Sequence, residues 1–347
     1  MQKLEELLLV HYPEMDTPGL FKGKMGACIY FFEAFHHNND PKYRQAGESI
    51  LQEVYTFIHQ NPVPTYFDNG LAGIAWGIHR LIKKGFIEGN ADELLEQVDH
   101  VLFRVISEKS EELEFGLKRG LMGYLLYVLD RLTPQPPKTG FHLSSELFIS
   151  LAVLLLNRLH LMAETGRASF TEPERFHLFW DLTCYLWLMA QAEKLGIHTD
   201  KLKQMKKDLT PTVLSCLPQN VANRLNLYGA MECLSVTEWE HHTQLMKKGL
   251  TDISLSRFKL ANKSLYMENG LAGLVFLDDQ IKSSIGDFNG IFHQNNNHLE
   301  AIRHMEKSEY WDYLSQNLNH ELGLLYGITG ICFSMLQLSK ENSSTLK

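Results

Sequence analysis

Two carboxylates stand in matching places along the chain, each two residues before a pair of glycines. Asp68 precedes Gly70 in FDNGLAG, and Glu268 precedes Gly270 in MENGLAG. Two carboxylates held at one end of a fold can act as acid and base on a sugar. The same positions also suit residues that cap the free amides of a helix and favour its positive end. We expect capping to be their role, with acid–base chemistry as the alternative.

The cysteines are the candidate nucleophiles. Cys28, Cys233 and Cys332 lie in apolar stretches that follow or interrupt the glycine signature. A reactive thiol needs an electropositive and partly exposed setting, and nothing in these stretches indicates one. We expect small buried thiols. Because the chain has five cysteines and no CxxC, a disulfide framework is not expected either.

A glycine signature determines which elements position these residues. Two glycines three residues apart open an apolar stretch at 23–26, 69–73, 119–123, 269–273 and 326–330, and a weaker copy, LYGAME, lies at 227–232. Recurrence at a spacing of tens of residues predicts a repeat architecture. Between the copies, the apolar residues fall three or four apart, which indicates amphipathic helices. No stretch shows the alternation of a strand.

The spacing of the copies predicts about seven helix pairs. Most first glycines lie 41 to 57 residues apart, but Gly120 and Gly229 are separated by 109. A copy without glycines should fill this gap, and the apolar run Phe176–Ala190 is the candidate. Apolar inner helices and amphipathic outer helices together predict an all-α fold, a double-layered α/α toroid. The first glycine would permit a turn, and the second would let neighbouring helices approach closely.

We expect a single toroid domain over residues 1–338 and a polar tail over 339–347. Thr133–Gly140 and Asp278–His298 are expected to be loops, the second long enough to be a functional flap or disordered.

Charge and composition exclude several classes of partner. The 347 residues carry a net charge of −8 with no basic block, which argues against nucleic acid and against an anionic membrane surface. The N-terminus shows no signal-peptide pattern, and we expect no segment long enough to cross a membrane. We therefore expect a cytoplasmic protein.

The repeats resemble those of the lanthionine synthetase C-like family, in GKMGACIYFFEAF, NGLAGIAWGIHRL, RGLMGYLLYVLDRL and LLYGITGICFSMLQL. The resemblance covers essentially the whole chain. It implies an α/α toroid with a zinc ion at one end of the central cavity, held by two cysteines and a histidine. In the family's enzymes this zinc activates a substrate thiolate, which adds to a dehydrated serine or threonine and forms a thioether.

This chain departs from the family pattern at the three metal-ligand positions. Where the resemblance implies a cysteine before Tyr228, the chain has Leu227, and the expected cysteine and histidine before Gly270 are Glu268 and Asn269. These residues and Tyr326 surround the place implied for the metal. Since leucine cannot bind a metal and asparagine is a poor zinc ligand, we expect no zinc site and no other cofactor.

The resemblance also implies a histidine for proton transfer at the start of the fourth inner helix, and His177 falls near that position. Its alternative role is a histidine hydrogen-bonded at a helix start, which we favour, because acid–base work needs reach that a sequence does not show.

Two classes of function follow from the resemblance. The first is a metal-free peptide-binding or scaffold component in a pathway that matures ribosomal, lantibiotic-like peptides, with a peptide substrate or a peptide-modifying enzyme as partner. The second is an active enzyme, either a zinc-independent thioether cyclase that uses His177 or a carbohydrate-active toroid that uses Asp68 and Glu268. The missing ligands favour the first and argue against zinc-dependent cyclase activity.

Overall fold

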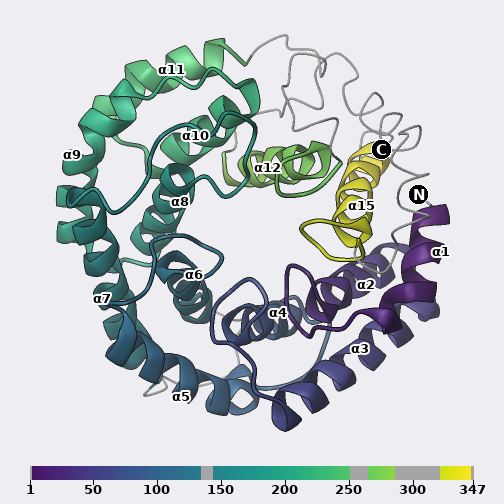
Figure 1. Cartoon of the computed structure of the whole chain (residues 1–347). Coiled ribbons are helices and arrows are strands. Elements are labelled where there is room, and N and C mark those ends of the chain that lie inside the picture. Colours follow the sequence, from purple (N-terminus) through teal and green to yellow (C-terminus); the bar gives the residue numbers. More distant parts are fainter. Residues whose placement is uncertain (1, 134–143, 251–264, 286–320, 345–347) are drawn as a thin grey trace.

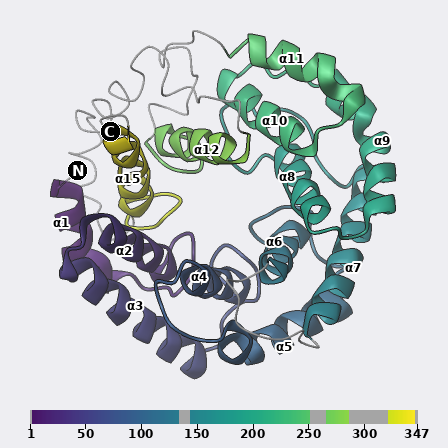
Figure 2. The ribbon, with the colours of Figure 1, turned by 180° about the vertical axis from the view of Figure 1, so that it is seen from behind.

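The computed structural model describes residues 2–133, 144–250, 265–285 and 321–344. Within these ranges the chain forms α-helices and two short 3-10 turns, with no strand. The helices form a ring with an inner and an outer layer (Figure 1), and the view from behind shows the same two layers (Figure 2). The all-α toroid that the repeats predict is confirmed.

The inner layer carries the apolar helices that the glycine signatures predict. Its members are α2 (Lys24–Asn38), α4 (Leu71–Lys83), α6 (Leu121–Leu132), α8 (Asp181–Lys194), α10 (Val221–Leu234), α12 (Leu271–Ser284) and α15 (Ile328–Ser344). Helix α8 fills the gap between the third and fifth copies, as expected. The inner ring closes where α15 packs against α2.

The outer layer contains the amphipathic helices. Its members are α1 (Gln2–His11), α3 (Pro41–Gln60), α5 (Ala91–Lys109), α7 (Ser144–Glu164), α9 (Thr199–Ser215) and α11 (Glu240–Lys248), with 3-10 turns at Tyr12–Glu14 and Thr237–Trp239. Helix α3 begins as its sequence indicates: Asp40 accepts a bond from the Lys42 amide at 3.1 Å, and Pro41 occupies the first position. Its apolar stripe is buried against α2.

The glycine pairs leave room for backbone carbonyls of the loop that precedes their helix. At α4 the Leu71 amide donates to the Pro64 carbonyl at 2.8 Å. A Cβ on Gly70 would lie 2.4 Å from that oxygen, and one on Gly73 only 1.9 Å from the Phe67 carbonyl. The same bond, seven residues back along the chain, recurs at α2, α6 and α15, from Lys24 to Thr17, from Leu121 to Glu114 and from Ile328 to Glu321.

One expectation about the helix starts is incomplete, and a second is wrong. A Cβ on Gly73 would first meet the Phe67 carbonyl in the loop of the same repeat, but neighbouring repeats also approach these glycines closely, with Leu20 near Gly73 and Phe67 near Gly123. Helices α4 and α12 have no side-chain cap, so Asp68 and Glu268 do not cap them. The loop carbonyls bind the free amides and leave both carboxylates available for other contacts.

Helix α7 corrects the expectation about membrane spans. Its segment Ser145–Glu164 is long and apolar enough to cross a membrane by length and composition, which is weak support for a span because core helices pass the same test. Leu151, Leu155 and Leu159 are buried, and α7 packs against α5 and α6. These contacts are those of an outer helix of the ring.

The long loop expected at Asp278–His298 is wrong in its first part, because α12 continues to Ser284. Residues 286–298 and 134–140 lie outside the described ranges.

Candidate functional site

The inner helices begin around a cavity of about 470 Å³, which we call the mouth pocket. The loops before α2, α4, α6, α8 and α15 all line it. Its charged and titratable residues are Lys22, Asp68, Glu114, Lys118, Arg119, His177, Asp181 and Tyr326. The mouth pocket therefore collects residues from places far apart in the sequence.

A series of backbone hydrogen bonds joins these loops to one another. The bonds run from Phe21 to Asp68 (2.8 Å), Asp68 to Lys118 (2.9 Å), Leu178 to Glu268 (2.7 Å), Glu268 to Leu325 (3.3 Å) and Leu325 to Phe21 (3.0 Å), each from an amide to a carbonyl. Every one of these residues lies three positions before the first residue of its helix. Asp68, Lys118 and Glu268 are thus structural equivalents on a rigid set of loops.

Lys118 and Glu268 form the central ion pair of the site. Lys118 Nζ donates to Glu268 Oε1 and, at 2.9 Å, to the Tyr326 hydroxyl. Glu268 is only 5% exposed, so its charge requires a cation. Burial lowers the pKa of Lys118, but the bonds to Glu268 and Tyr326 outweigh this effect and raise its pKa overall. The lysine is therefore charged at neutral pH.

His177 lies beside this pair, with Nε2 at 3.5 Å from Glu268 Oε1. Burial lowers the pKa of His177, and Lys118 acts in the same direction, whereas Glu268 opposes them. At neutral pH the ring is accordingly neutral and can accept a proton. Burial also raises the pKa of the Tyr326 hydroxyl, so this group remains protonated.

Helix α10 holds the loop that carries His177. The Asn223 side-chain oxygen accepts from the His177 amide at 3.2 Å, and its nitrogen donates to the Pro173 carbonyl at 3.0 Å. One turn along, Asn226 donates to the Leu178 carbonyl at 3.2 Å. The sequence reading missed this role, although two asparagines three residues apart on an apolar helix were a signal for it.

The fifth glycine copy does not open an inner helix, which corrects the register expected from LYGAME. Helix α10 begins at Val221, capped by Asn220, so Gly229 lies in its interior. Leu227 and Tyr228 are fully buried in that helix and do not line the mouth pocket. The structure thus separates these two residues from Tyr326, which lines the pocket, and from Asn269, which immediately precedes the Gly270 that caps α12.

Asp68 reaches the mouth pocket but contacts a different cation from Glu268. Its Oδ2 lies 3.5 Å from Arg119 Nε, and its Oδ1 accepts from the Asn69 amide at 2.5 Å. The two carboxylates of the expected acid–base pair therefore form ion pairs with different basic residues, Asp68 with Arg119 and Glu268 with Lys118.

Asp181 is a further acid of the mouth pocket that the sequence reading did not single out. It is the first residue of α8, and burial raises its pKa from 3.8 to about 6. A helix start favours the charged form of a carboxylate, so the opposing effect of burial is the stronger one here. A weak acid near neutral pH can hold or release a proton as its surroundings change.

The side chains present do not fit the zinc ion that the resemblance implies at this end of the ring. Of its three expected ligands, Leu227 is apolar and buried, Asn269 is an amide, and Glu268 is paired with Lys118. Among the described residues, the one group of three converging histidine, cysteine or carboxylate ligands lies in the outer layer, at His160, Glu164 and Asp208. A catalytic zinc site has three protein ligands and an open fourth position, and a structural site has four protein ligands.

The cysteines are free thiols, as expected, and Cys28, Cys184 and Cys332 are buried. The expectation of a buried thiol is wrong for Cys233, which is only partly buried. Burial raises the pKa of Cys28, Cys184 and Cys332 well above the ordinary value, and it raises that of Cys216 to about 11. These thiols are protonated at neutral pH and make poor nucleophiles.

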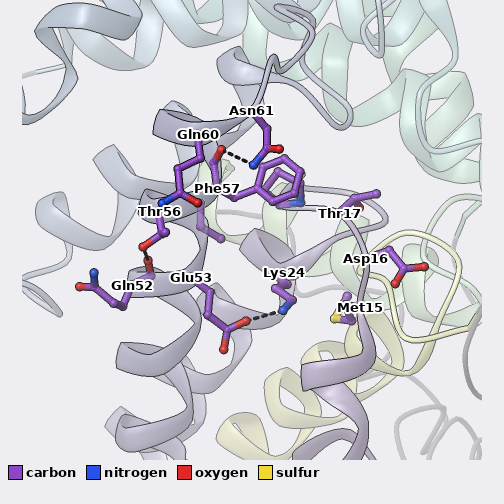
Figure 3. A pocket seen from close by; sticks show the side chains of 12 residues that line it. Met15, Asp16, Thr17, Lys24, Gln52, Glu53, Thr56, Phe57, Gln60 and Asn61 are labelled. Atoms are coloured by element: carbon purple, nitrogen blue, oxygen red, sulfur yellow. Dashed lines mark hydrogen bonds and ion pairs between the residues drawn. The ribbon is translucent and has the colours of Figure 1, made fainter.

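Two other pockets have walls in which opposite charges already pair. A pocket of about 320 Å³ lies between α3 and the segment before α2, where Lys24 binds Glu53 (Figure 3). A pocket of about 600 Å³ has Lys84 bound to Glu33 in its wall. Neither is lined by a histidine, and the mouth pocket remains the strongest candidate site.

Comparison with known proteins agrees with this architecture. Residues 14–178 match the sequence model of a family described as lanthionine synthetase C-like protein. A comparison with curated proteins gives no significant match. Among solved structures, the chain is similar to "Nisin cyclase", with a TM-score of 0.73 and 14% identity over 98% of this chain and 94% of that chain. At this identity the likeness concerns the fold. The chain therefore matches the lanthionine synthetase C-like family in sequence over residues 14–178, just under half of its length, and shares the fold of the similar solved structure over nearly all of its length.

Proposed function

We propose that this protein binds a peptide at the mouth pocket, as a metal-free component of a pathway that matures ribosomally made, lantibiotic-like peptides in the cytoplasm. The observation that carries the proposal is the Lys118–Glu268 pair. A lysine ammonium neutralises the carboxylate at a position where the family resemblance implies a metal ligand. The similar solved structure is named for the cyclisation of nisin, a name that supports a peptide as the bound molecule here.

The mouth pocket has the chemistry to hold a peptide. Lys22 and Arg119 offer cations on its wall, and Asp181 offers a carboxyl group. Arg119 is well exposed, since its side chain retains 63% of its accessible surface. The rigid loops fix the spacing of these groups, so a peptide would bind without reordering the site.

The test uses a synthetic peptide that contains one dehydroalanine and one cysteine. Thioether closure conserves mass, so free thiols are counted by alkylation and mass spectrometry while binding is followed by fluorescence anisotropy. We expect saturable binding without thiol loss. Arg119→Glu should weaken binding at least tenfold, whereas Lys203→Glu, on the outer helix α9, should not. Equal binding by wild type and Arg119→Glu would refute the proposal.

A zinc-independent cyclase is the second candidate, and the position of His177 favours it. A neutral His177 could take the proton from a substrate thiol, after which sulfur would bond to the β-carbon of the dehydrated residue. A protonated Asp181 could deliver a proton to the α-carbon, so that no atom is lost. Thiol loss in the same assay that disappears in His177→Ala would establish this candidate in place of the first.

A further inference from the structure

Three metal-ligand side chains meet in the outer layer, outside the mouth pocket. His160 and Glu164 lie one turn apart on α7, and Asp208 lies on α9, the next outer helix in both views of the ring (Figures 1 and 2). His160 Nε2 lies 3.3 Å from Glu164 Oε1 and 3.2 Å from Asp208 Oδ2. The three ligand atoms all fall within 4.8 Å of one another.

The imidazole of His160 is buried and lacks a hydrogen bond. Only 2% of the residue is exposed, and neither Nδ1 nor Nε2 has a hydrogen-bond partner among the described residues. The two carboxylate oxygens approach Nε2 closely without forming a hydrogen bond to it. A buried polar atom without a partner is costly, and this one is aimed at the space between two carboxylates.

The distances agree with the edges of a metal coordination polyhedron. Zinc binds nitrogen and carboxylate oxygen at about 2.0–2.2 Å in tetrahedral geometry. Two ligands on such an ion are therefore roughly 3.3–3.5 Å apart. The two separations from His160 Nε2 lie close to this range without any movement of the helices.

We propose that His160 Nε2, Glu164 Oε1 and Asp208 Oδ2 bind a divalent cation of the zinc type, with water as the fourth ligand. Gln204 donates to the other oxygen of Asp208 at 2.7 Å, which orients the carboxylate as an outer-shell partner does. The side chains of Glu164 and Asp208 are 50% and 30% exposed, so an ion can enter from solvent. A bound ion would join α7 to α9 and strengthen the outer layer.

A simple ion pair of a protonated His160 with two carboxylates is the competing explanation. The geometry argues against it, because Nε2 lies 3.2–3.3 Å from an oxygen of each carboxylate and yet forms a hydrogen bond to neither of them.

The test titrates chelator-stripped full-length protein with zinc chloride by calorimetry and follows thermal unfolding in parallel. We expect one zinc per chain and a higher unfolding midpoint. Asp208→Asn and Glu164→Gln change partly exposed side chains, so both variants should fold, which circular dichroism checks. Each should weaken zinc binding at least tenfold. Asp200→Asn, on the same helix with a side chain 97% exposed, is the matched control and should bind as wild type does.

The site is supported if saturable zinc binding is lost in Glu164→Gln and Asp208→Asn and is kept in Asp200→Asn. Cobalt bound at the same site should then give the strong visible absorption of a tetrahedral complex. Absence of saturable binding, or equal affinity in Asp208→Asn and Asp200→Asn, overturns it. Zinc at the mouth pocket would be insensitive to all three variants. Peptide binding should be unchanged in Asp208→Asn, so this proposal and the proposed function fail separately.

Discussion

Replacement of Asp181 by asparagine tests whether the ionised Asp181 carboxylate in the mouth pocket destabilises the fold. Burial raises the pKa of Asp181 from 3.8 to about 6, so the folded state holds its proton more tightly than the unfolded state does. Stability then falls as pH rises from about 4 to 6, and the loss is complete above that window. The two pKa values correspond to about 3 kcal/mol as an upper limit. Because the side chain is partly exposed, we expect about 1–2 kcal/mol.

The assay is urea unfolding of wild type, Asp181→Asn and the exposed control Asp200→Asn between pH 4 and pH 7. Asp181→Asn should match wild type at pH 4 and exceed its free energy of unfolding by about 1–2 kcal/mol at pH 7. The control should follow wild type throughout. A difference that is constant with pH would show that the substitution acts through packing, and the reasoning from ionisation would then be refuted.

Three further variants test the contacts that build the site, each by its free energy of unfolding. Lys118→Met leaves Glu268 buried without its main cation. Because the lysine is a third exposed, we expect the free energy of unfolding to fall by about 2–3 kcal/mol. An unchanged free energy of unfolding would show that the ion pair does not stabilise the site. Gly73→Ala gains up to about 1 kcal/mol in helix propensity but forces a Cβ against the Phe67 carbonyl. We therefore expect a net loss of stability of about 1–3 kcal/mol. The control Gly116→Ala should leave stability nearly unchanged, because its Cβ would meet nothing closer than 3.8 Å. Asn223→Ala should lower stability by about 1–3 kcal/mol, because it leaves the His177 amide and loop carbonyls unpaired. The control Asn157→Ala, at an exposed position of α7, should lower it far less.

The sequence predicted the ring because the glycine pairs recur at the helix starts, including a place for α8 where both glycines are missing. It did not predict why glycine is needed there. The reason lies in hydrogen bonds between backbone amides and carbonyls seven residues apart, and backbone groups leave no pattern in the sequence of side chains. The register of the fifth repeat was also wrong: LYGAME looked like a helix start, but Asn220 caps α10 a full two turns earlier.

Residues of the site were predicted where they share a register, or where the family resemblance implied them, as for His177 and Tyr326. Asp68 and Glu268 were found because each precedes a glycine pair, and Lys118 stands at the same register before Gly120. It was overlooked because a lone lysine next to Arg119 reads as a solvated surface. Its role depends on a contact across 150 residues, which no local pattern contains.

Lys118 also supplies the positive charge that the buried carboxylate of Glu268 requires. A carboxylate as buried as that of Glu268 needs a positive charge close by, and either a metal ion or an ammonium group can provide it. The two are not equivalent for chemistry. A zinc ion offers an open coordination position that stabilises a thiolate, whereas the ammonium of Lys118 already donates to Glu268 and Tyr326. Under the proposed function, the lysine holds the carboxylate while the site recognises a peptide, and activation of a thiol would then fall to His177.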